Sequence, residues 1–466
     1  MGADDGFGDT VTSHRNTPEG LIRALGPIAA GAFVVTNMIG SGIFTIPAFV
    51  RVATGSALGS LWVWVAVGLF SMCGALCYSE LATHMPRAGG EYRFLTDGFG
   101  QAWGFLSGWT SFVVGFSAAV AASSLGAMAY LAPLVGGWDP EAPLIAGLGV
   151  SQGAAAASAL VLALTLVHCI GVRWSGSLQT VLATLVVGSI GVMVVAGFST
   201  GNGEWSGLMA RTQPQSSWWV AFIQVSYAYA GWNAAAYIAG EVRDPSKNLP
   251  KAILGGTLFV MVAYVLINAL FFYALPEAEW EPTIAVGHLA AERLFGETGS
   301  LAVSGLIALA MFGSASAMMA VGPRIYFAMA RDGVAPRFLA ELSDRSVVPT
   351  LAIAAQGGLA AILALTGAFE VLLIYIGSSL LLFNGLTVAT LFVVRRRRRS
   401  AGGDGSTLFR TPFHPAPAVI FLAVTIAAWI NGLIYAPLPT GAALGTLAVG
   451  GAIYLVGTRL GWFQNT

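Results

Sequence analysis

Charged residues are scarce in this sequence, and their scarcity limits the class of protein. Only 9% of the 466 residues are Asp, Glu, Lys or Arg, whereas soluble globular domains contain roughly 25%. Hydrophobic residues make up 56% of the chain, and the mean hydropathy is +0.75. A water-soluble fold has no interior large enough to bury this much apolar surface, so a soluble domain is excluded.

Cysteine is also rare, with three residues in the whole chain. Cys73, Cys77 and Cys169 all fall within apolar stretches, and none falls in an outward-facing loop where a disulfide would form. Cys73 and Cys77 lie one helical turn apart, but a soft-metal site would need further ligands nearby. We therefore expect neither a metal site nor a cofactor.

A cleavable leader is a third feature that the sequence does not show. Residues 1–21 are polar, and no short apolar stretch with a small-residue cleavage site precedes the first long apolar run. We therefore expect no cleaved signal peptide, and we expect the first helix to direct membrane insertion.

Long apolar runs are what the sequence does contain. Each run has about 20 residues, enough for a helix to cross the roughly 30 Å hydrocarbon layer. Barrel strands would alternate apolar and polar residues, and these runs do not. The predicted fold class is an all-α polytopic membrane protein with about twelve transmembrane helices. They lie roughly at 25–50, 57–83, 101–133, 153–171, 176–199, 217–240, 251–275, 300–330, 349–367, 369–394, 415–435 and 440–460.

Cations fall mostly in alternate loops, and cytoplasmic loops are enriched in Lys and Arg. The pattern predicts that both termini are cytoplasmic. The run Arg395–Arg399 beside a span end is best interpreted as a topology anchor, although a lipid-phosphate switch or a nucleic-acid patch was also considered. The cations on the predicted inner side are Arg15, Arg23, Arg87, Arg93, Arg173, Arg243, Lys247, Lys251, Arg331, Arg337, Arg345, Arg395, Arg396, Arg397, Arg398, Arg399, Arg410 and Arg459.

Two spans contain a glycine-bearing break within a continuous apolar run. The first break reads MIGSGIF, residues 38–44, and the second reads YAYAGWN, residues 227–233. Breaks five spans apart are typical of two inverted five-helix repeats that hold a substrate near the middle of the membrane. Glycine is common in membrane helices, however, so simple close packing is the alternative interpretation of the first break.

Four motifs, in order along the chain, resemble the amino acid–polyamine–organocation superfamily, and the closest likeness is to its L-type amino acid transporter branch. The motifs are IGSGIFTIP at 39–47, GALCYSELATHMPRAGGEYRFL at 74–95, AYAGWN at 228–233 with EVRDPSKNLPKAI at 241–253, and GPRIYFAMARDGVAP at 322–336.

The resemblance implies a leucine-transporter fold with ten core helices and two peripheral helices. The corresponding parts are a cytoplasmic tail at 1–24, repeats at 25–199 and 217–394, a cytoplasmic basic loop at 395–414, and two peripheral helices with a short tail at 415–466. It also implies a secondary transporter in the cell membrane rather than an enzyme.

The expected substrate site lies at the two breaks. The free N–H groups of Ser41, Gly42 and Ile43 open a half-helix and can hold a substrate carboxylate. The carbonyls of Met38 and Ile39 can accept from the ammonium. By resemblance, Tyr227, Ala230 and Trp232 supply the second half of the site, and Tyr227 is an aromatic gate. An interfacial or core aromatic is the alternative interpretation of Tyr227.

Missing charges shape the expected substrate and coupling. No acid follows Trp232, where relatives that take cationic substrates often have one, so we expect small neutral amino acids. The family's lysine position in span five holds Val186, and the first lysine of the chain is Lys247. Span eight offers Ser314 and Ser316, but these are not adjacent. We therefore expect exchange of one amino acid for another. The alternatives are proton symport, or transport of cationic amino acids or polyamines.

Three ionisable residues lie close to the membrane core. Glu80, Glu241 and Arg324 form either an inner gate or proton path, or ordinary interfacial ion pairs.

Other function classes fit less well. Residues Gly149–Gly153 match G-x-S-x-G, but a hydrolase needs a strand–turn–helix setting and a positioned His and acid. A channel would need a repeated ring of pore residues, and the sequence has none. A receptor that binds an amino acid without transporting it is an alternative. The expected partners are the amino acid and the bilayer, not nucleic acid. Because the loop from Leu134 to Gln152 has no cysteine, no disulfide-linked accessory subunit is expected.

Overall fold

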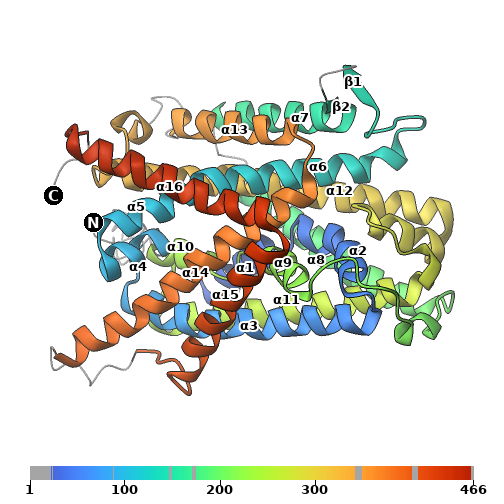
Figure 1. The fold of residues 1–466 in the computed structure, drawn as a ribbon, viewed down its shortest axis with the longest axis horizontal. Coiled ribbons are helices and arrows are strands. Elements are labelled where there is room, and N and C mark those ends of the chain that lie inside the picture. Colours follow the sequence, from blue (N-terminus) through green and yellow to red (C-terminus); the bar gives the residue numbers. More distant parts are fainter. Residues whose placement is uncertain are drawn as a thin grey trace, which may run out of the picture.

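A computed structural model gives the fold of this chain (Figure 1). It describes residue 23 and residues 25–87, 89–145, 149–170, 175–341, 349–400 and 408–462, without the side chains of 175–183 and 278. The tail at 1–22, Arg173, Arg345 and residues 401–407 of the expected basic loop lie outside the described residues.

Helices make up almost all of the described chain. The α-helices are α1 Pro27–Met38, α2 Ser41–Thr54, α3 Ala57–His84, α4 Gly90–Phe99, α5 Gln101–Thr110, α6 Ala119–Leu131, α7 Gln152–Ile170, α8 Ser175–Ser199, α9 Trp218–Ala228, α10 Ala234–Tyr237, α11 Pro245–Ala274, α12 Val286–Arg331, α13 Thr350–Leu365, α14 Phe369–Ser400, α15 Ala416–Tyr435 and α16 Pro437–Arg459. A π-helix, η1 Ser111–Ala118, joins α5 to α6. Short 3-10 turns are η2 Ala132–Leu134, η3 Ser206–Met209, η4 Ala239–Glu241, η5 Glu277–Glu279 and η6 Arg337–Ala340.

Eight helical segments in the described chain are long and apolar enough to cross a membrane by themselves. The α1–α2 pair is a ninth span if its two halves are counted together, because they meet at a 43° bend. Two apolar helices, Thr184–Ser199 and α13, are shorter. The structure therefore confirms a polytopic helical membrane protein, and the count of twelve spans stays a prediction.

The long helices run side by side along the long axis of the molecule (Figure 1). α3 packs against α11, and α6 lies between α12 and α7. α14 crosses obliquely and contacts α9, α15, α16 and α4. α1 packs against α11, and α2 packs against α9. The two broken segments lie in the interior, where Met38, Ile43 and Tyr227 are buried.

Backbone conformation explains both breaks. Ile39 leaves the helical region at the end of α1, and Gly40 adopts φ −126° and ψ −147° before α2 begins. In the second break, Gly231 has φ +105°, a conformation that side chains strongly disfavour. A Cβ at Gly231 would lie 2.7 Å from the carbonyl oxygen of Asn37. Glycine therefore allows the two breaks to touch.

Three segments differ from or refine the expectations. α14 continues to Ser400, so Arg395–Arg399 belong to a helix and not to the loop expected at 395–414. Ser151 ends β2 (Val150–Ser151), a two-residue strand that pairs antiparallel with β1 (Pro143–Ile145). Its hydroxyl accepts a hydrogen bond from the Ala154 N–H at 3.2 Å. The G-x-S-x-G serine thus caps the start of α7, a structural role.

Candidate functional site

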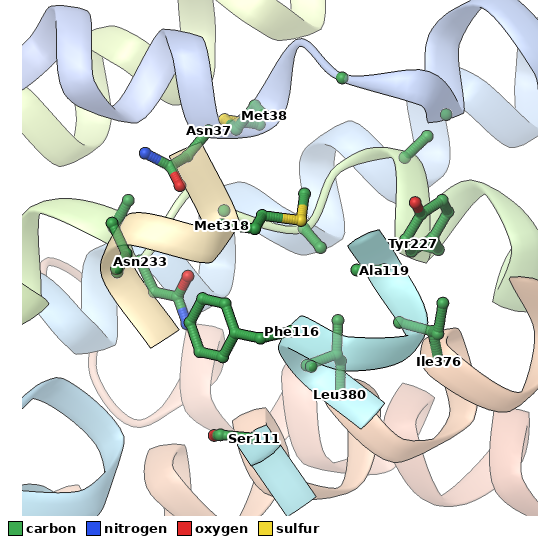
Figure 2. A pocket seen from close by; sticks show the side chains of 18 of the residues that line it. Asn37, Met38, Ser111, Phe116, Ala119, Tyr227, Asn233, Met318, Ile376 and Leu380 are labelled. Atoms are coloured by element: carbon green, nitrogen blue, oxygen red, sulfur yellow. The ribbon is translucent and has the colours of Figure 1, made fainter. Parts of the chain in front are cut away.

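A cavity of about 90 Å³ lies between the two broken segments. It is lined by five of the residues that the sequence predicted for substrate binding: Met38, Ser41, Gly42, Tyr227 and Ala230. A water molecule occupies roughly 10–15 Å³ on this measure, so the cavity has room for a small polar solute. Figure 2 shows Tyr227 and Asn233 at opposite ends of this space.

The start of α2 forms one wall of the cavity. Gly40, Ser41 and Gly42 line it, and no side chain caps the first N–H groups of α2. Uncapped N–H groups and the positive end of the helix dipole together favour an anion. Gly42 also permits close approach of the second break, because a Cβ there would lie 2.6 Å from the Ala228 Cα.

Hydroxyl groups close the cavity beside α2. The Tyr227 hydroxyl and the Ser41 Oγ are 2.9 Å apart, and Ser123 on α6 donates to the same Ser41 Oγ at 3.3 Å. These contacts join α9, α2 and α6 above the cavity. Tyr227 is therefore placed where a gate would act, in direct contact with a residue of the helix start.

One tyrosine joins the two breaks from outside the cavity. The Tyr264 hydroxyl on α11 lies 2.5 Å from the carbonyl oxygen of Met38 and 3.0 Å from that of Ala228. Met38 also accepts from the N–H of Gly40 at 2.9 Å. The Met38 carbonyl, which the sequence assigned to a substrate ammonium, therefore accepts from Gly40 and lies beside a tyrosine hydroxyl whose single proton can go to only one of two carbonyls.

The rest of the cavity wall is largely apolar. The π-helix η1 contributes Ser111, Gly115 and Phe116, and the widened turn is typical of functional sites. Phe116 and Met318 approach the space from opposite sides (Figure 2). Among the residues that line the cavity none is Asp, Glu, Lys, Arg or His; those not yet named are Phe33, Asn37, Ala119, Gly231, Ala234, Tyr237, Val321, Ile376, Leu380 and Asn384.

Three of the predicted site residues do not line the cavity. Ile39 and Ile43 are buried in the apolar core, although the expected role of Ile43 involved only its backbone N–H. The ring of Trp232 packs edge-on against Tyr78 at 4.7 Å and against Phe421 at 6.3 Å. Trp232 therefore packs behind the residues that line the cavity.

The three ionisable residues singled out in the sequence form ion pairs. The carboxylate of Glu80 accepts from Arg395 at 2.6 and 2.8 Å and from the Thr411 N–H at 2.7 Å. Glu241 and Arg324 are 3.9 Å apart, and the Arg324 side chain is 62% exposed. Neither pair lines the cavity, and a role in gating or proton transfer stays a prediction.

Glu91 is a buried acid beside the cavity that the sequence analysis did not single out. It begins α4, a ten-residue helix too short to span a membrane, and only 4% of its surface is exposed. Its Oε1 accepts from the Asn233 amide at 2.5 Å, and Asn233 lines the cavity. Burial raises the pKa of Glu91 to about 7, although hydrogen bonds from Tyr78 and Asn233 oppose the shift.

A sequence signal for Glu91 did exist. It stands in Gly89–Gly90–Glu91 directly after the second span, within a motif that carries the family resemblance. Both glycines have positive φ, +115° and +48°. The chain turns at these two glycines and places Glu91 beside Asn233 of the span-six break. The two residues are 142 positions apart, so sequence spacing does not reveal their contact.

Comparison with known proteins agrees with this geometry. The sequence profile of amino acid permeases matches residues 25–453. Asc-type amino acid transporter 1 of Mus musculus is 30% identical over 390 residues, which cover 81% of this chain and 71% of that protein. Large neutral amino acids transporter small subunit 2 of Homo sapiens is 29% identical over 453 residues, covering 94% and 81%.

A bacterial relative has comparable coverage. The serine/threonine exchanger SteT of Bacillus subtilis (strain 168) is 27% identical over 416 residues, covering 87% of this chain and 90% of that protein. The profile match extends over both broken segments and all the lining residues of the cavity. This chain therefore belongs to the amino acid permease family.

Proposed function

We propose that this protein carries small neutral amino acids across the cell membrane by alternating access, in exchange for internal amino acid. The observation that carries the proposal is the uncapped start of α2, which faces a cavity whose other side is the span-six break. An amino acid brings a carboxylate and an ammonium, and both need polar partners away from water.

The two ends of a bound amino acid are assigned to different breaks. The carboxylate takes the N–H groups of Ser41, Gly42 and Ile43. Because the Met38 carbonyl already accepts from the Gly40 N–H and has the Tyr264 hydroxyl beside it, we assign the ammonium to the carbonyls of Tyr227 and Ala230. The Ile39 carbonyl remains a further candidate.

The cavity wall supports a neutral side chain. A cationic side chain would find no carboxylate among the lining residues. Glu91 is the nearest acid described above, but the Asn233 amide lies between it and the cavity. We therefore favour alanine, serine and similar substrates over arginine, lysine and polyamines.

The described part of span eight supports exchange without a coupled sodium ion. Ser314 lies against Gly40, where an added Cβ would be 2.8 Å from its hydroxyl oxygen. Ser316 instead contacts the His168 Nε2 at 3.0 Å. The two hydroxyls therefore do not converge on one ion. Val186, at the expected lysine position, is buried in the core.

Proton symport is the second candidate, and Glu91 is the observation that favours it. A buried carboxyl group with a pKa near neutrality can bind and release protons during transport. The proposal of exchange predicts that any proton bound by Glu91 is not carried across the membrane.

The wider architecture is proposed from the family resemblance. It comprises twelve spans, two inverted five-helix repeats, both termini in the cytoplasm, and no disulfide-linked partner.

A competition assay tests the substrate class. Purified protein in proteoliposomes loaded with L-serine takes up labelled L-serine against an excess of each common amino acid. We expect alanine, serine and threonine to compete strongly, and arginine, lysine and putrescine to compete weakly. A cation that outcompetes alanine would contradict the neutral-substrate proposal. Chemically unchanged serine inside the vesicles would exclude an enzyme, and binding without uptake would indicate a receptor.

A further inference from the structure

Glu91 is a deeply buried carboxylate that has no cationic partner among the described residues. Other acids at the same end of the molecule do have one. Glu80 is paired with Arg395, and Asp332 is paired with Arg93 at 2.6 Å. We call this end, where α4 meets the Arg395–Arg399 segment of α14, the basic face. A carboxylate held there without a cation is costly when ionised.

The hydrogen bonds around Glu91 provide a place for a proton. The Tyr78 hydroxyl lies 2.9 Å from Glu91 Oε1 and 3.0 Å from Asn384 Oδ1. A tyrosine hydroxyl has a single proton to donate, and it faces two acceptors. If Glu91 carries a proton and donates it to Tyr78, the tyrosine is free to donate to Asn384. Both contacts are then hydrogen bonds.

This chain of hydrogen bonds ends at the cavity in two places. Asn384 on α14 lines the cavity, and so does Asn233, whose amide donates to Glu91. The elements packed around α4 are α5, α10 and α14. Glu91 therefore lies beside two elements that border the cavity, α10 and α14, on the side of Asn233 away from the cavity.

The groups that face Glu91 do not replace a missing cation. Tyr78 from α3 and Tyr237 from α10 are the titratable groups beside it, and neither supplies a positive charge. The pKa of Glu91 is shifted by burial and by its two hydrogen bonds, with no contribution from another charged side chain. Loss of solvation on burial is therefore the main factor that opposes ionisation of Glu91 near neutral pH.

We propose that Glu91 is a proton-binding site that controls opening of the cavity toward the basic face. The inference rests on the proposed transport function. Protonated Glu91 completes the hydrogen bonds that hold α4, α10 and α14 together. Ionised Glu91 requires water, and water enters when these elements separate. With opening toward the basic face, the proton leaves and returns on that side. The proton therefore regulates exchange without being transported.

The test measures L-serine exchange in preloaded proteoliposomes, with equal pH on both sides, at about pH 6, 7 and 8. A carboxyl group with a pKa of about 7 changes from roughly one-tenth to nine-tenths ionised over this range. Because the rate follows the ionised fraction, we expect the wild-type exchange rate to rise about ninefold. Glu91→Gln keeps a neutral, hydrogen-bonding side chain, so its rate stays at the low-pH value throughout. Glu80→Gln, at a carboxylate paired with Arg395, keeps the wild-type pH slope.

Tyr78→Phe provides a second arm if the Glu91→Gln protein does not assemble. Loss of the tyrosine hydroxyl removes the acceptor of the Glu91 proton in the closed arrangement, so the protonated form is destabilised and the midpoint of the pH profile moves to lower pH. A wild-type rate that does not change with pH, or a Glu91→Gln rate that follows the wild-type profile, would overturn the inference. An unmoved midpoint in Tyr78→Phe would also overturn it. The absence of L-serine exchange in every protein at every pH would instead contradict the proposed function.

Discussion

Single residues explain how the two broken segments come into contact. Gly42 and Gly231 are placed where a Cβ would collide with Ala228 and Asn37 of the opposite break. The sequence placed Gly42 at the substrate carboxylate, and the structure adds that its missing side chain also admits the second break. Substitution there would act on the packing of the site as well as on its space.

We predict that Gly42→Val reduces L-serine transport by roughly tenfold or more while the protein still inserts in the membrane. Its branched side chain would meet the Ala228 backbone, where an added Cβ is already 2.6 Å from Cα, and overpacking typically costs about 1–3 kcal/mol. Uptake normalised to the amount of folded protein measures the effect. Gly445→Val is the matched control, because nothing lies within 4 Å of that position. Normal uptake by Gly42→Val would refute the break as the substrate site.

We also predict a pH effect on stability at Glu91. Its pKa of about 7 in the folded protein exceeds the ordinary value of 4.5. The contribution of protonated Glu91 to the stability of the folded protein is therefore fully present below about pH 4.5 and is lost as pH rises through 7. Between about pH 6 and 8, the melting temperature of the wild type in detergent falls more than that of Glu91→Gln. Equal slopes for the two proteins would show that Glu91 does not titrate in this range.

At the scale of the elements, the sequence predicted the two breaks and most long helices but not their exact number. Glycine within an apolar run indicates a break, because it weakens a helix and permits unusual backbone angles. The extension of α14 through Arg395–Arg399 was missed, since a cation run resembles a loop by composition. Its helical form depends on tertiary contacts, including Arg395 with Glu80.

The π-helix η1 could not be predicted from local sequence. Residues 111–118 read as ordinary apolar helix, and the widened turn depends on packing of η1 against α13 and α14. Glu91 illustrates the same limit, because its partners Tyr78 and Asn233, and the Tyr78 partner Asn384, come from three distant helical regions. Long-range pairing of polar residues is set by the fold, and periodicity carries no information about it.

We predict that Tyr264→Phe lowers both stability and transport. The Tyr264 hydroxyl lies within hydrogen-bond distance of the Met38 and Ala228 carbonyl oxygens. Leaving a buried polar group without a partner costs about 1–3 kcal/mol. The melting temperature in detergent and L-serine uptake are the two measurements. Tyr375→Phe is the control, because its hydroxyl bonds Thr446 at 2.6 Å between α14 and α16, away from the breaks. Equal effects of the two substitutions on transport would contradict a special role for Tyr264.

At the scale of the whole molecule, composition alone correctly indicated the membrane class, and four ordered motifs correctly indicated the permease family. The substrate class and the mode of coupling can be inferred only once the arrangement of the cavity is known. We propose that its apolar wall selects a neutral solute and that the separation of Ser314 from Ser316 leaves sodium without paired hydroxyls. Both features depend on side-chain direction, which the sequence does not specify.

Uptake of labelled L-serine into three sets of proteoliposomes tests the central claim most directly. The vesicles are empty, preloaded with unlabelled L-serine, or empty under an imposed proton or sodium gradient. Exchange predicts strong accumulation only in the preloaded vesicles, because the carrier returns readily only when it is occupied. Strong gradient-driven uptake into empty vesicles would contradict exchange and identify a symporter.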